Sequence, residues 1–271
     1  MEKFICKTCG TQFPATAVPP IHCPICADER QYIGWDGQQW TTLAELQADH
    51  QNKIADEEPN LTGIGTTPGF AIAQRALLVQ TPQGNLLWDC ITLLDEATKT
   101  AVNRLGGIDA IAISHPHYYS SMIEWAHAFD APIYLHAADQ QWLMRPDPAV
   151  EFWEGETKSL WDGLTLIRGG GHYAGGTLLH WPAGANGAGV LLTGDIIQVV
   201  SDRRWVSFMY SYPNLIPLPA KKVREIETAV TPFNFDRIYG AWWGRVVRED
   251  AKAAVSRSAD RYIAALSAGR R

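Results

Sequence analysis

The sequence predicts an α/β protein in which two β-sheets are sandwiched between helices, preceded by a small cysteine-rich module. The first observation is a change of pattern near residue 61, after which short apolar runs occur in pairs and then alternate with helical segments. The second is that most of the cysteines lie before residue 30, in two closely spaced pairs. With 271 residues, 46% of them hydrophobic, the chain is long enough for one full α/β domain and a small extra module.

Residues 1–40 are predicted to form a four-cysteine zinc ribbon. Cys6 and Cys9 make one C-x2-C pair, and Cys23 and Cys26 make a second. Each such turn directs two thiolates at one point, so the two pairs supply the four ligands of a tetrahedral metal site. Zinc is the expected metal, and a rubredoxin-like iron centre is the alternative, because iron also binds four thiolates. The fifth cysteine, Cys90, lies in an apolar run and is expected to be a small core residue.

Residues 41–60 are predicted to be a short helix and a linker. Thr41 or Thr42 is suited to cap the helix, with Glu45 in its first turn. The following residues, 51–59, are polar and acidic and are therefore interpreted as a linker to the main domain, residues 61–271.

The main domain is predicted from a series of apolar runs and amphipathic segments separated by glycine, proline and polar turns. The expected strands are 70–73, 75–80, 86–90, 108–113, 133–136, 164–167, 177–181, 190–193 and 237–239, and the expected helices are 95–105, 121–129, 221–230 and 249–268.

Two histidines follow the apolar run 108–113 at a spacing that suits a metal. His115 and His117 are two residues apart at the end of the expected strand. Side chains at i and i+2 of a strand point the same way, so both imidazoles are able to converge on one ion. A third histidine, His172, lies between glycines, whose conformational freedom suits a loop that carries a ligand.

The segment His115-Pro116-His117-Tyr118-Tyr119-Ser120 resembles the H-x-H-x-D-H signature of the metallo-β-lactamase superfamily. The glycine-flanked loop around His172 is similar to the family's Gly-His-Thr-Pro-Gly loop, and Gly194-Asp195 resembles its Gly-Asp ligand. Asp89 matches a structural aspartate that braces the histidine loop in the family. The resemblance covers residues 61 to about 245 and implies a metal-dependent hydrolase of αββα architecture.

The sequence departs from this family at the ligands of the second metal. Tyr119 and Ser120 stand where the signature has Asp and His, and a tryptophan, Trp242, stands where the family has a late histidine. Phenol, hydroxyl and indole are poor metal ligands. The resemblance therefore implies a site for one metal, held by His115, His117, His172 and Asp195, with zinc expected and iron(II) as the alternative.

The expected chemistry is hydrolysis by metal-activated hydroxide. Tyr119 is interpreted either as a partner of the oxyanion or leaving group or as a filler of the vacant second-metal space. Asp195 is expected to be a ligand or a general base. The aromatic segment 199–219 predicts a wall or lid over a pocket for a small, fairly apolar substrate, or else a packing surface.

The net charge and the pI of the chain disfavour some classes of binding partner. A net charge of −6 and a pI of about 5.7 disfavour nucleic acid and anionic membranes as partners. No apolar run reaches the ~18 residues of a membrane span, and no signal peptide is recognised, so a cytoplasmic protein is expected. We expect two zinc ions per chain and a small-molecule substrate, with a homo-oligomer as the alternative to a monomer. The alternatives in function are an iron oxygenase that uses the ribbon as an electron carrier, and a non-catalytic metal-binding protein.

Overall fold

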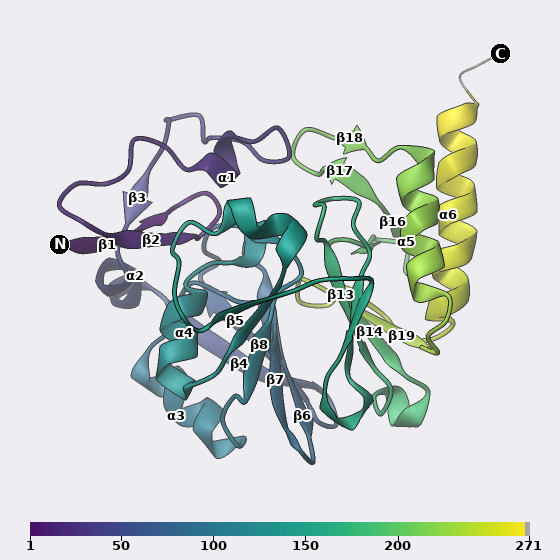
Figure 1. The fold of residues 1–271 in the computed structure, drawn as a ribbon, viewed down its shortest axis with the longest axis horizontal. Coiled ribbons are helices and arrows are strands. Elements are labelled where there is room, and N and C mark those ends of the chain that lie inside the picture. The colour runs from purple at the N-terminus through teal and green to yellow at the C-terminus, as the bar shows by residue number, and fades with distance from the viewer. Residues whose placement is uncertain (269–271) are drawn as a thin grey trace. The chain divides into compact units, whose positions relative to one another are not determined.

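The computed structural model describes residues 1–268, which divide into two units, Met1–Trp153 and the residues from Glu154 onward. Each unit contains one large sheet with its own helices (Figure 1). The boundary between the units lies inside the predicted domain 61–271, and the predicted ribbon belongs to the first unit. Within the described residues, no helix combines the length and apolar character that a membrane crossing requires.

The ribbon is a three-stranded sheet with one short helix. Strand β1 (Glu2–Cys6) lies between β2 (Gln12–Thr16) and β3 (Trp40–Thr41) and is antiparallel to both, and α1 (Pro24–Ala27) carries the last cysteine. The four cysteines form a buried cluster with Phe13 and Ile25. The buried centre of the ribbon is therefore made of thiol and apolar side chains together.

Helix α2 (Leu43–Asp49) follows the ribbon and begins at a capping box. The Thr42 hydroxyl accepts a hydrogen bond from the Glu45 amide, and the Glu45 carboxylate accepts one from the Thr42 amide. This confirms the helix and its cap. The prediction of a linker over residues 51–59 is wrong, because β4 (Gln51–Glu58) is an edge strand that pairs with β5 (Leu61–Thr67).

The first unit contains a seven-stranded mixed sheet. Strands β4, β5, β6 and β7 pair antiparallel in chain order, and β7, β8, β9 and β10 continue the sheet in parallel. The remaining elements of this unit are β6 (Arg75–Thr81), β7 (Gly84–Trp88), α3 (Glu96–Arg104), β8 (Ala110–Ala112), α4 (Met122–Phe129), β9 (Ile133–His136) and β10 (Val150–Trp153).

One strand predicted for this unit is absent. Residues 70–73 form a turn, in which Ala71 and Ala73 adopt positive φ angles of 53° and 57°. The strand that pairs with β6 is β5, whose Gly63 and Gly65 interrupt the apolar pattern that would have revealed it.

The second unit contains a six-stranded sheet covered by two helices. The strand order is β11-β12-β13-β14-β19-β20, and only β14 and β19 are parallel neighbours. Helices α5 and α6 lie side by side (Figure 1) and bury Ile226 and Val255 against the sheet residues Leu191 and Ile238. The elements are β11 (Thr157–Ser159), β12 (Thr165–Arg168), β13 (Thr177–Trp181), β14 (Val190–Gly194), α5 (Ala220–Val230), β19 (Arg237–Gly240), β20 (Val246–Val247) and α6 (Ala251–Ser267).

The aromatic segment 199–219 forms two small hairpins. Strand β15 (Gln198–Val199) pairs with β16 (Val206–Ser207), and β17 (Met209–Ser211) pairs with β18 (Ile216–Pro217). Val206 and Phe208 are buried in the core of the second unit, and the guanidinium of Arg261 stacks on Trp205 with its Cζ 3.6 Å from the ring centroid. Part of the aromatic content is therefore packing.

Candidate metal centres

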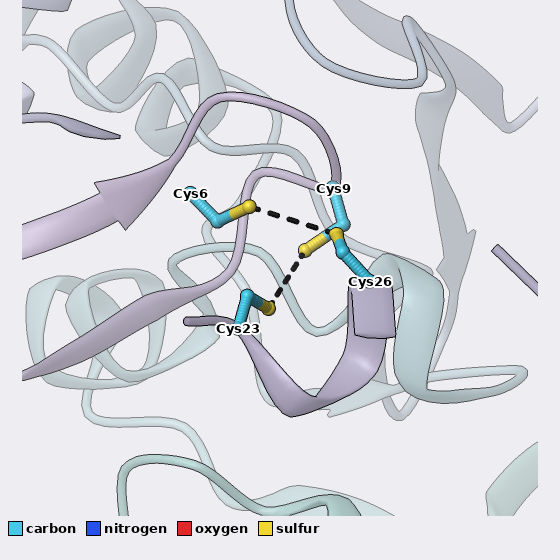
Figure 2. A group of neighbouring side chains, drawn as sticks. All are labelled: Cys6, Cys9, Cys23 and Cys26. Carbon is cyan, nitrogen blue, oxygen red and sulfur yellow. Dashed lines mark hydrogen bonds between the residues drawn. The ribbon is translucent and has the colours of Figure 1, made fainter. Parts of the chain in front are cut away.

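The four ribbon cysteines converge on one point, as predicted (Figure 2). The Sγ atoms of Cys6 and Cys26 are 3.6 Å apart, and those of Cys9 and Cys23 are 3.7 Å apart. A tetrahedral ion with zinc–sulfur bonds of about 2.3 Å would place its sulfurs about 3.8 Å from one another. The donor set and its spacing therefore fit a four-thiolate metal, whereas a disulfide would require a separation of about 2 Å.

Polar contacts hold the thiol cluster in place. The Gln38 amide donates a hydrogen bond to Cys6 Sγ at 3.2 Å, and its oxygen accepts one from the Cys23 amide at 3.0 Å. Hydrogen bonding from Cys23 lowers the pKa of Cys6, while the same neighbour raises the pKa of Cys26. Four thiols this close cannot all ionise in the absence of a cation, so a bound metal would relieve their mutual repulsion.

His115 and His117 lie in a buried loop after β8, which we call the histidine loop (residues 114–120). A single 3-10 turn, η1 (Pro116–Tyr118), begins directly after His115. The two imidazole rings have their centroids 5.1 Å apart, and both residues are almost fully buried. His115 Nδ1 lies 2.9 Å from the Ser114 hydroxyl, and a ring engaged through Nδ1 ligates a metal through Nε2.

Asp89 braces the histidine loop, as the family resemblance implied. Its Oδ1 accepts a hydrogen bond from the Ser114 amide at 2.8 Å. The residue follows β7 and has a φ of +60°, which turns its side chain toward the neighbouring loop. Burial raises the pKa of Asp89 from 3.8 to about 7.

His172 lies on the glycine-rich turn between β12 and β13. Gly170 and Gly171 have φ angles of +64° and +77°, so the backbone there is the left-handed conformation that glycine favours. Nδ1 of His172 donates to the main-chain oxygen of Tyr210 at 2.7 Å and is 3.2 Å from that of Met209. A carbonyl oxygen only accepts, so Nδ1 carries the proton and Nε2 carries the lone pair of a metal ligand.

Asp195 follows β14 at the turn made by Gly194. The residue is 5% exposed, and its main-chain oxygen accepts a hydrogen bond from the Tyr212 hydroxyl at 2.7 Å. Burial, together with the charge of Asp195, raises the pKa of Tyr212 well above its ordinary value, so this phenol stays protonated and serves as a donor.

The four predicted ligands are divided between the two units. His115 and His117 lie in the first unit, His172 and Asp195 lie in the second, and all four residues are buried within their own unit. The contacts that orient the ligands involve Ser114, which is adjacent to His115, and Tyr210, which is 38 residues from His172. Neither residue belongs to a sequence motif, so neither was predicted.

The residues predicted to replace the ligands of a second metal have different surroundings. Tyr119 is 2% exposed and closes η1. Ser120 has a φ of +47°, donates a hydrogen bond to the Cys90 carbonyl and accepts one from Gln74. Trp242 lies in the turn after β19 and is half-buried. Ser120 thus takes part in a local hydrogen-bond network.

Comparison with known proteins gives a family and a fold. No family model matches the sequence. The chain is 55% identical over 269 residues to a Bacillus subtilis (strain 168) protein named "Uncharacterized protein YmaE", with 98% of each chain covered. The chain belongs to the YmaE family. This YmaE-family chain is also similar in structure to solved metallo-β-lactamases.

The structural likeness extends over most of the chain. The DIM-1 metallo-β-lactamase exposed to ceftazidime has a TM-score of 0.60 at 14% identity and covers 79% of this chain and 98% of its own. VMB-1 gives 0.59 at 14%, covering 80% and 98%, and a Cronobacter sakazakii metallo-β-lactamase gives 0.53 at 16%, covering 79% and 93%. At these identities the likeness shows the fold. The YmaE-family chain therefore has the metallo-β-lactamase fold, with the four-cysteine ribbon at its N-terminus, as the sequence predicted.

Proposed function

We propose that this protein is a mononuclear metal-dependent hydrolase of a small, fairly apolar substrate. The observation that carries the proposal is the state of the histidines: His115, His117 and His172 are buried, and two of them have Nδ1 held by a neighbouring oxygen atom. Oriented, buried imidazoles are what catalytic zinc sites use.

The donor set fits one divalent ion. Three imidazoles leave an open position for water or substrate, which separates a catalytic site from a closed structural one. When bound, such an ion acidifies water and polarises a substrate carbonyl. Two metals per chain follow, with the other in the ribbon, and zinc is the ion we propose for both.

We assign the remaining steps to two side chains. Asp195 is buried, and its carboxylate is proposed to accept the proton of the attacking water. Tyr119 is two residues from His117, and its phenol is proposed to donate a hydrogen bond to the developing oxyanion or a proton to the leaving group. We propose that the substrate binds without the help of a second metal, because Tyr119 and Ser120 stand where the ligands of that second metal would be.

The test compares two buried histidines. His172→Gln removes a proposed ligand, whereas His180→Gln changes a strand histidine whose Nε2 contacts the Asn234 carbonyl. With p-nitrophenyl acetate as the probe ester, we expect kcat/KM to fall by about 100-fold or more in His172→Gln and by less than about threefold in His180→Gln. Circular dichroism and thermal melting show whether each variant is folded. A folded His172→Gln protein with wild-type activity would contradict the proposal.

A further inference from the structure

The cysteine ribbon is bonded directly to the histidine loop within the first unit. We propose that the ribbon is a positioning element, in which a metal held by the four thiolates fixes the backbone of the histidine loop and so sets the affinity of His115 and His117 for their own metal. This inference rests on the proposed function for what the loop binds, and it goes beyond that function by giving the ribbon a role at the second site.

Two hydrogen bonds to main-chain oxygens join the turn at Cys9 to the domain. The Gln12 amide donates to the Ser120 carbonyl at 2.9 Å, and the Thr92 hydroxyl donates to the Gly10 carbonyl at 3.0 Å. The Gly10 amide in turn donates to the Cys6 carbonyl at 2.8 Å, which closes the cysteine turn. Gly10 is thus hydrogen-bonded both to Cys6 and to Thr92. Gln12, two residues further on, is hydrogen-bonded to the histidine loop.

Ser120, whose carbonyl accepts the hydrogen bond from Gln12, has an unfavourable backbone conformation that its neighbours must stabilise. A φ of +47° lies in the left-handed region, which residues other than glycine rarely adopt. Its hydroxyl donates to the Cys90 carbonyl at 3.3 Å and accepts from the Gln74 amide at 3.1 Å. Ser120 is three residues from His117, so a change in its backbone is passed along one turn to the ligand.

An ionic chain makes a second link between the ribbon and the domain. Arg145 donates to the Gln12 side-chain oxygen and also to Glu124 on α4, at 2.6 Å in the latter case. Lys3 of β1 donates to the same Glu124 carboxylate at 2.8 Å. The start of β2 is therefore anchored both to the histidine loop and to the helix that follows it.

The residues around the contact between Gly10 and Thr92 are tightly packed. A Cβ placed on Gly10 would lie 2.3 Å from Thr92 Oγ1 and 3.4 Å from the Ala71 side chain. The cavity beside it, lined by Thr11, Gln12, Tyr119 and Ser120 among others, has a volume of about 10 Å³, which is room for one water at most. A shift of the cysteine turn is therefore transmitted to the histidine loop.

Two glycine substitutions provide a matched test that leaves all four cysteines in place. Gly10→Ala drives a methyl group into Thr92, whereas Gly37→Ala, in the same ribbon, adds a methyl that meets nothing within 4 Å. The two positions have similar left-handed φ angles, +82° and +78°, so the backbone strain of the two substitutions is matched. The full-length proteins are titrated with Zn²⁺ against a chelator, and amide hydrogen exchange is followed by mass spectrometry.

We expect Gly10→Ala to weaken the second Zn²⁺ by tenfold or more and to speed exchange in residues 114–121. Gly37→Ala should change the affinity by less than twofold, and exchange in β12–β14 should be unaltered in both variants. Equal effects of the two substitutions on affinity and on exchange would overturn the proposal.

A third variant, Cys9→Ser, weakens the thiolate site itself. The proposal predicts that it loses Zn²⁺ affinity at the histidines together with ribbon metal, and it is contradicted if only the ribbon metal is lost while exchange in 114–121 is unchanged. If the wild-type protein binds no Zn²⁺ at the histidines, the proposed function fails. The exchange data alone then decide whether the ribbon positions the loop.

Discussion

At His172, two main-chain carbonyls determine which ring nitrogen carries the proton. The contact of Nδ1 with the Tyr210 oxygen leaves the Nε2 lone pair for a ligand. At His115 the Ser114 hydroxyl occupies the same position, and Ser114 is itself held by Asp89. The candidate site is therefore specified by the residues that orient the ligands as well as by the ligands.

The raised pKa of Asp89 should make the free energy of unfolding depend on pH. Burial raises the pKa of Asp89 to about 7 in the folded protein, so the folded state holds the proton more tightly than the unfolded state, whose value is 3.8. The protonated carboxyl stabilises the fold below pH 4, and this contribution is lost as the pH rises toward 7. The matched variant, Asp89→Asn, keeps an oxygen for the Ser114 amide but does not titrate.

Urea unfolding of the two proteins between pH 4 and pH 7.5 measures this effect. We expect the free energy of unfolding of the wild type, relative to Asp89→Asn, to fall by about 4 kcal/mol over this range. A difference between the two proteins that stays constant with pH would show that Asp89 does not titrate in this way.

At the scale of single elements, a helix or strand could be predicted where its own residues carry a recognisable pattern. Helix α2 is visible in the sequence because Thr42 and Glu45 have the spacing of a capping box. Strand β4 is not, because Ile54 and Ala55 are its only apolar residues and the other six are polar or charged. Its Glu57 is drawn inward by an ion pair with Arg75, whose guanidinium lies 2.9 Å from the carboxylate, and that partner is distant in sequence.

The Thr42 cap of α2 should contribute measurably to the stability of the protein. Thr42→Ala removes the hydroxyl that accepts from the Glu45 amide, and the free energy of unfolding is expected to fall by about 1 kcal/mol. Thr42→Ser keeps the acceptor and should stay within about 0.5 kcal/mol of wild type in the same urea titration. A loss of equal size in both variants would mean that the methyl group, and not the cap, matters there.

At the scale of the whole molecule, the sequence was sufficient for the fold, and the residues assigned as metal ligands stay predictions. The paired C-x2-C turns and His115-Pro116-His117 are short-range patterns, so they are readable without a structure. The roles of Tyr210 and Ser120 arise from contacts between segments far apart in the chain, and no spacing rule reports those. The division of the chain after residue 153 was also not predicted.

We propose that the chain holds two metals at two chemically different sites. Elemental analysis of the full-length protein, beside a His115→Ala/His117→Ala variant, tests this most directly. We predict two zinc ions per wild-type chain and one per variant chain, with the remaining ion bound by the four cysteines. An equal metal content in the two proteins, both folded, would contradict it.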